Sequence, residues 1–227
     1  INIKKNDDRY YHLLLLVENE EGYKNLCKLI AASYSKGFYF KPRIDYELLQ
    51  AHHRGLIATS TCLGGHIPQL LLQDKMNDAK ILLHQMHDLF QDRFFLEVQP
   101  GVIREQQILN DHIFTLEKEF NIPIIATGDC HYSTREDRYA HEVMLAIQTR
   151  TTMTDPKRMT FGECQAHMQT PEEMLSVFSH REDIVWRTGE IADRCNFTFQ
   201  TGKLFFPRFE IPKDFTDNKA YFEQLCK

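Results

Sequence analysis

Short apolar segments alternate with helix-like segments along the first 130 residues, and this alternation most constrains the fold. Four segments have the length and apolar content of buried strands: residues 10–18, 55–65, 93–99 and 123–129. Each is followed by residues with helical apolar spacing or with helix-starting signals. Such alternation is typical of βαβ units around a parallel sheet. The sequence therefore predicts an α/β fold, and periodicity leaves open whether the sheet is an open one or a barrel.

Capping signals predict where several helices begin. Asn19 precedes two glutamates and an apolar stripe that ends near Gly37, which predicts a helix over this range. Residues 133–136 and 170–173 both have the spacing of a capping box. Further helices are expected at residues 66–73, 76–90, 104–120, 136–148 and 181–195, and in the last ten residues. Beyond residue 150 the strand–helix alternation ceases.

Composition excludes several classes of protein. No apolar run approaches the roughly 20 residues of a membrane span, and the first residues lack the layout of a signal peptide. The six cysteines, at positions 27, 62, 130, 164, 195 and 226, form no C-x-x-C pair, which favours reduced thiols in a cytosolic setting. The net charge of −5 makes the surface as a whole a poor candidate for non-specific DNA binding, although a local basic patch is not excluded.

Potential metal ligands stand at the end of the fourth predicted strand. Asp129 and His131 are two residues apart, so in a strand their side chains would share one face. In α/β folds, catalytic groups gather at the carboxyl ends of the strands. A metal site is one interpretation of this pair. The other is that Asp129 caps a turn and His131 is an ordinary hydrogen-bonded loop histidine.

Two further residues of the same chemistry belong to other predicted strands. His12 lies in the apolar run of residues 10–18, and Cys62 follows the strand of residues 55–65 beside two glycines. Nitrogen, sulfur and carboxylate ligands together suit zinc best, with manganese or iron as alternatives. The alternatives to a ligand role are a hydrogen-bonded core histidine and a buried structural thiol. The sequence contains no Walker A, G-x-G-x-x-G, G-x-S-x-G or H-E-x-x-H motif.

Nine stretches resemble one known family. The segments "YYHLLLLVENEEGYKNLCKLIAASYSKGFYFKPRIDYELL", "GLIATSTCLGG", "IPIIATGDCHY", "AHEVMLAIQT", "TMTDPKRM" and "TPEEMLSVF" resemble the PHP (polymerase and histidinol phosphatase) domain of the bacterial DNA polymerase III alpha-subunit family. The segments "TGEIADRCNFTF", "LFFPRFEIP" and "YFEQLC" are similar to the region that leads from that domain towards the polymerase palm. The resemblance covers nearly the whole chain in the expected order.

The resemblance implies a distorted (βα)7 barrel of the TIM type with a metal cluster at the carboxyl ends of its strands. Residues 1–150 would form part of the barrel, residues 151–200 the mainly helical end of the domain, and residues 201–227 a helical and extended linker. The metal ligands carried over onto this sequence are His12, Cys62, Asp129 and His131. The family's other ligands precede its equivalent of the His12 strand. The resemblance therefore implies a fragment without the opening strands, about half of the ligands and the polymerase carboxylates.

The function implied is that of one part of a replicative DNA polymerase. In the full protein this domain would be a metal-dependent phosphoesterase, a 3′–5′ exonuclease that uses zinc, manganese or magnesium. The alternative is an inert scaffold that braces the polymerase and docks a separate proofreading exonuclease subunit. A free-standing phosphatase of the same superfamily leaves the segments after residue 150 unexplained.

The implied partners are DNA, bound through the full polymerase, the proofreading subunit and other replisome proteins, and no membrane. The isolated piece is expected to be inactive. The edges of a truncated barrel tend to pair with another chain, which predicts self-association.

Overall fold

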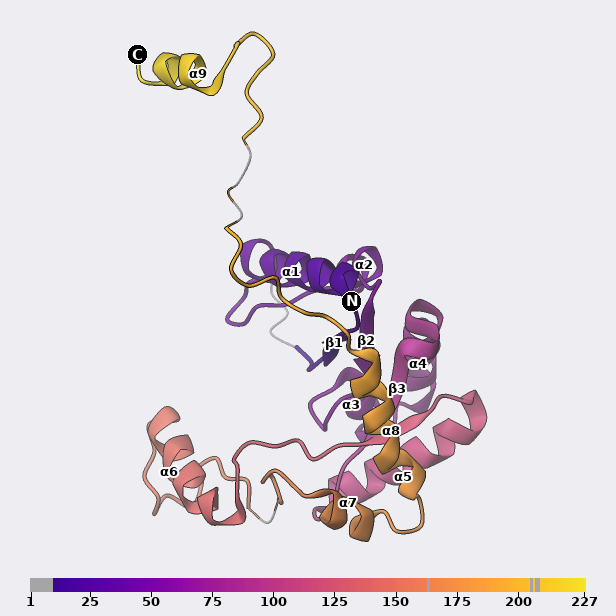
Figure 1. Ribbon diagram of the computed structural model, residues 1–227. Coiled ribbons are helices and arrows are strands. Elements are labelled where there is room, and N and C mark those ends of the chain that lie inside the picture. Colours follow the sequence, from indigo (N-terminus) through magenta and orange to yellow (C-terminus); the bar gives the residue numbers. More distant parts are fainter. Residues whose placement is uncertain (1–9, 163, 205, 207–208) are drawn as a thin grey trace. The chain divides into compact units, whose positions relative to one another are not determined.

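The computed structural model describes residues 10–162, 164–204, 206 and 209–227. The chain divides into two compact units, Ile1–Phe197 and Thr198–Lys227. The first contains a four-stranded sheet and most of the helices (Figure 1). The predicted mixed α/β class is confirmed, whereas a (βα)7 barrel is not.

The sheet has the order β1-β2-β3-β4, which is also the order along the chain. Its strands are β1 (Leu15–Val17), β2 (Leu56–Thr59), β3 (Phe94–Val98) and β4 (Ile124–Ala126). Strands β2, β3 and β4 are parallel, as predicted. Strand β1 is antiparallel to β2, which corrects the expected all-parallel sheet. Two helices connect β1 to β2. The first residue of β2, Leu56, pairs with the last residue of β1, Val17, so the two strands run in opposite directions.

The helices lie close to the predicted positions. Their bounds are α1 (Glu20–Ser35), α2 (Tyr46–Ala51), α3 (His66–Leu72), α4 (Met76–Phe90), α5 (Arg104–Phe120), α6 (Arg138–Gln148), α7 (Pro171–Val177) and α8 (Glu182–Arg194). The Asn19 side chain accepts from the Gly22 backbone N–H and starts α1 as expected. The capping box of Thr170 with Glu173 starts α7. The other predicted box is displaced by one residue, because Thr134 pairs with Asp137.

Side chains from both faces of the sheet are buried. On one face, Leu56, Phe94, Leu96 and Ile124 pack in a large cluster with apolar side chains of α3, α4 and α5. On the other face, Ile57, Phe95 and Ile125 pack against Ile191 of α8 in a smaller cluster. Helix α8 also covers the outer edge of β4, where Arg187 donates to the carbonyl oxygen of Ile124 at 2.6 Å. The predicted self-association stays a prediction.

Two strands differ from expectation, and both carry candidate ligands. Strand β1 is shorter than residues 10–18, and its three residues are only half-buried because it forms an edge of the sheet. His12 lies before it and is exposed. Strand β4 ends at Ala126, three residues before Asp129. The pairing ends there because Thr127 makes the last backbone bond to Val98, at the end of β3, and the next glycine leads into a turn.

The second unit contains helix α9 (Asn218–Leu225), as the last residues predicted. The Asp217 side chain caps its first turn by accepting from the Ala220 N–H at 2.8 Å. Phe209 and Phe215 pack on the ring of Tyr221. Among the described residues of the whole chain, every helix is too short or too polar to cross a bilayer.

Candidate metal centre

His12 and Cys62 lie in direct contact at the carboxyl end of β2. The Nδ1 atom of His12 is 3.4 Å from Sγ of Cys62. The backbone fixes the two segments side by side, because the N–H of His12 donates to the carbonyl oxygen of Gly64 at 2.9 Å. The structure therefore brings together two of the four predicted ligands, from segments 50 residues apart.

A glycine makes this contact possible. A Cβ atom on Gly64 would lie 2.8 Å from Nδ1 of His12 and 3.1 Å from two ring carbons. Any side chain at this position would displace the imidazole from Cys62. The glycine turn noted in the sequence thus forms the surface against which His12 packs.

The turns that carry Cys62 and Asp129 both contain a residue in the left-handed backbone region. Thr61 has φ of +60° and Asp129 has φ of +46°. Aspartate tolerates this region, whereas a β-branched threonine rarely adopts it. Strain of this kind persists only where the surrounding structure imposes it, and it clusters at functional sites. The left-handed conformation of Asp129 also means that Asp129 and His131 do not share a strand face, contrary to the sequence-based argument.

Asp129 lies near enough to Cys62 to affect its thiol. Burial is the main cause that raises the pKa of the Cys62 thiol; the N–H of Gly64 opposes this rise, and the negative charges of Asp129 and Glu97 add to it. Burial and then the charge of Asp129 raise the pKa of the Cys164 thiol in the same way. The negative charge of Asp129 therefore acts on both thiols, and it would stabilise a cation bound between these residues.

His131 is held by its own turn. Its Nδ1 atom lies 2.7 Å from the backbone oxygen of Asp129, and its ring packs edge-on against Phe161 with centroids 4.6 Å apart. A backbone carbonyl on one ring nitrogen leaves the other nitrogen as the basic one, which is the usual arrangement of a histidine that binds metal. The hydrogen bond is also the one expected of an ordinary loop histidine.

The ligand types fit a zinc-like cation, but the described residues do not form a complete site. Zinc–nitrogen and zinc–sulfur bonds of about 2.1 and 2.3 Å place two tetrahedral ligands about 3.6 Å apart. The separation of His12 and Cys62 is close to this value. Within the part of the chain that the structure describes, no three His, Cys, Asp or Glu side chains are gathered as metal ligands. The four-residue ligand set stays a prediction.

A buried polar cluster beneath this site was not predicted. Glu97 of β3 is only 4% exposed and accepts hydrogen bonds from Thr59 and Thr127, each at 2.6 Å, and from Gln99 at 3.0 Å. The only signal in the sequence was a glutamate within the otherwise apolar run of residues 94–98. A buried strand covered on both faces gives no reason to expect a charge there.

A cavity of about 690 Å³ opens beside His12. Apolar and aromatic side chains form most of its wall, and Thr59, Ser60 and Thr61 form the part next to the candidate site. Tyr11 stacks on His66 at this wall, with ring centroids 4.1 Å apart. The volume lies in the range of small-ligand pockets.

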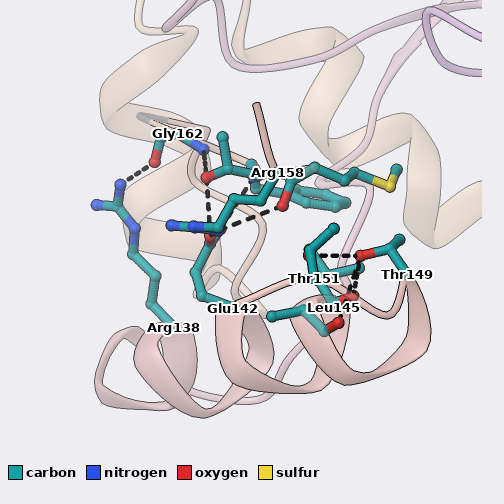
Figure 2. A network of polar contacts seen from close by, with 11 residues as sticks. Arg138, Glu142, Leu145, Thr149, Thr151, Arg158 and Gly162 are labelled. Carbon is teal, nitrogen blue, oxygen red and sulfur yellow. Dashed lines mark hydrogen bonds and ion pairs between the residues drawn. The ribbon is translucent and has the colours of Figure 1, made fainter. Parts of the chain in front are cut away.

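A second buried glutamate lies outside this site. Figure 2 shows Glu142 of α6, which bonds to the guanidinium of Arg158. Glu142 also accepts from the hydroxyl of Thr160 at 2.7 Å and from the N–H of Phe161 at 2.9 Å. Burial alone would raise the pKa of Glu142, but these hydrogen bonds outweigh it and lower the pKa to about 2. The network fastens residues 158–162 to α6, and Arg138 adds a bond to the carbonyl oxygen of Gly162.

Comparison with known proteins identifies the class of this fold. Residues 1–101 match the family described as PHP domain, and this part of the chain is a PHP domain. The match contains two of the predicted ligands, His12 and Cys62, as well as Glu97.

The relatives are subunits of one enzyme. The chain is 40% identical to DNA polymerase III subunit alpha of Thermus aquaticus over 228 residues, which cover 96% of this chain and 18% of the relative. It is 36% identical to the protein of the same name from Treponema pallidum, covering 96% and 19%. The corresponding protein of Deinococcus radiodurans is 40% identical, covering 89% and 16%. The chain thus spans about a fifth of the length of the curated relatives that it matches.

Proposed function

We propose that this chain is the PHP part of a DNA polymerase III alpha subunit, the DNA-synthesising subunit of a bacterial replicase. The similarity to such subunits over 96% of the chain supports this assignment. DNA and the other replisome proteins would be partners of the full polypeptide. DNA synthesis itself would belong to other parts of that polypeptide.

Within it, this domain removes mispaired nucleotides from the 3′ end of DNA by metal-dependent hydrolysis. The observation that carries this proposal is the contact between His12 and Cys62 beside the field of Asp129. A divalent cation, zinc or else manganese or magnesium, would be held by these residues with His131, and it would supply an activated water and charge stabilisation. The aromatic wall of the adjacent cavity offers a surface on which an unpaired base could stack.

The test is cleavage of a 3′-mismatched primer by the full polymerase polypeptide, with bound metal measured in the same preparation. Asp129→Ala is expected to lower both exonuclease activity and metal content while DNA synthesis persists. Exonuclease activity that survives in Asp129→Ala and in His131→Ala would contradict the proposal. Such a result would place the activity elsewhere in the polypeptide.

The second candidate function is a scaffold that docks a separate proofreading subunit. It is favoured by the apolar side chains that α6 exposes, among them Tyr139, Met144 and Ile147. Substituting these three residues by polar ones should then weaken binding of the proofreading subunit at least tenfold in a pull-down titration. Unchanged binding, together with metal-dependent cleavage, would leave the hydrolytic role.

A further inference from the structure

Glu97 joins the three parallel strands at the end that carries the candidate ligands. One carboxylate oxygen accepts from Thr127 of the β4 side at 2.6 Å and from Gln99 at 3.0 Å, and the other accepts from Thr59 of β2 at 2.6 Å. Gln99 also bonds to Thr127 at 3.4 Å. All these donors lie on the sheet face that bears Ile57, Phe95 and Ile125.

Each threonine stands at the base of a turn with a candidate ligand. The hydroxyl of Thr59 also accepts from the N–H of Thr61 at 3.1 Å, and Thr61 is the left-handed residue directly before Cys62. Thr127 lies two residues before Asp129, and its N–H donates to Val98 at 3.0 Å. One threonine side chain therefore connects the carboxylate of Glu97 to each of the two turns.

The charge of Glu97 makes these contacts strong. No Lys or Arg side chain of the described chain forms an ion pair with it, so the hydrogen-bond donors alone solvate the buried carboxylate. Hydrogen bonds to an ionised acceptor are shorter and about twice as strong as neutral ones. Separations of 2.6 Å lie at the short end of the range for O–H donors. Each bond fixes the rotamer of its threonine and hence the start of the turn that follows.

We propose that Glu97 is a positioning residue: through Thr59 and Thr127 it holds the Cys62 turn and the Asp129 turn at a fixed separation, so that both can serve one divalent cation. The cation part of this inference rests on the proposed function. Glu97 itself is not a ligand of the cation, because three donors already point at its two oxygens.

Hydrogen exchange and cobalt binding of the 227-residue chain test the proposal together. Glu97→Leu removes the acceptor at similar volume, Glu97→Gln keeps an acceptor without the charge, and Glu142→Gln is the matched control at the other buried glutamate. Glu97→Leu should speed exchange about tenfold in residues 60–65 and 127–132, since a lost charged hydrogen bond is worth about that factor. It should also weaken Co²⁺ binding about 10- to 100-fold, the usual effect of losing a partner that orients ligands. Glu97→Gln should keep most of the wild-type protection and most of the Co²⁺ affinity, and Glu142→Gln should leave exchange in residues 60–65 unchanged.

Three outcomes would overturn the positioning role. Unchanged exchange in either segment of Glu97→Leu would contradict the link between the turns. Glu97→Gln with wild-type exchange and the full loss of Co²⁺ affinity would assign the effect to charge and not to position. If Glu97→Leu does not fold, Thr127→Val replaces it, and this variant must speed exchange in residues 127–132 while leaving 60–65 unchanged. A wild-type chain that binds no Co²⁺ would contradict the cation part of this inference, and the exchange result would still decide the role of Glu97.

Discussion

Glu97 and Glu142 are both buried glutamates, but their charges are balanced differently. Glu142 is 6% exposed and bonds to Arg158, so its charge is neutralised within α6 and the segment packed on it. Glu97 is 4% exposed, and its partners within the described residues are hydroxyl and amide groups. The neutralised Glu142 carboxylate fastens one segment to α6 and needs no further cation. The Glu97 carboxylate instead fixes the groups that donate to it, among them the two threonines at the base of the candidate site.

The largest expected effect is on the neutralised glutamate. Arg158→Met keeps much of the side-chain packing but leaves the Glu142 carboxylate buried without its cation. Removing one partner of a buried pair destabilises by about 3–5 kcal/mol, which should appear in urea unfolding. The matched control is Arg194→Met, which breaks the partly exposed pairs with Glu18 and Asp92 and should cost at most about 1 kcal/mol. Equal losses of unfolding free energy in Arg158→Met and Arg194→Met would show that the buried pair is no stronger than the partly exposed ones.

Acid should act on the same glutamate. The pKa of Glu142 is about 2 in the folded chain and 4.5 in a free glutamate. The stabilisation is therefore fully present above about pH 4.5 and is lost as the pH falls towards 2. The free energy of unfolding of Glu142→Gln should change less with pH across this window than that of the wild type. The difference between the two changes should reach up to about 3 kcal/mol. Chemical unfolding at several pH values measures it, and parallel curves for variant and wild type would contradict the ion pair.

A smaller loss of stability is expected when Glu97 keeps its charge but loses one hydrogen-bond donor. Thr127→Val removes one of its 2.6 Å hydrogen bonds without changing side-chain volume greatly. The free energy of unfolding should fall by about 1–2 kcal/mol, as for other buried acceptors left short of a donor. Thr149→Val, directly after α6, is the control, because Thr149 is exposed and, among the described residues, its hydroxyl bonds to the helix end and to a neighbouring threonine. Equal losses in the two variants would mean that the charge of Glu97 adds nothing.

The smallest effect on stability, with a clear effect on binding, belongs to Gly64. A methyl group there would meet the His12 ring at 2.8 Å, so Gly64→Ala should separate His12 from Cys62 and weaken Co²⁺ binding about tenfold. Gly189→Ala in α8 is the matched control, because nothing lies within 4 Å of the added methyl. It should stabilise the helix by about 0.5–1 kcal/mol and leave binding unchanged. Wild-type affinity in Gly64→Ala would show that the two side chains do not bind one cation.

The sequence predicted the order of strands and helices well, because local signals decide these features. The Asn19 cap, the Thr170 capping box and the apolar stripes all act over a few residues. The direction of β1 could not be predicted, since it depends on how two helices return the chain to the sheet. The end of β4 was also missed: its length is set by where β3 stops offering partners, which is a property of another segment.

For the candidate site, residue type pointed to His12 and Cys62, and the structure places them in contact. The shared face predicted for Asp129 and His131 was wrong, because the left-handed conformation of Asp129 interrupts the alternation. Glu97 could not be recognised, since nothing in a single sequence shows that threonines at the ends of two other strands lie beside it. A buried charge can be identified only when its partners in space are known.

The central claim is that His12, Cys62 and Asp129 serve one divalent cation, and the absorption spectrum of the cobalt-loaded chain tests it most directly. A thiolate ligand gives a sulfur-to-cobalt charge-transfer band, which should be present in the wild type and in Cys130→Ser. The band should disappear in Cys62→Ser and weaken strongly in His12→Ala and Asp129→Ala. Co²⁺ that binds without this band, or a band that survives in Cys62→Ser, would contradict the account.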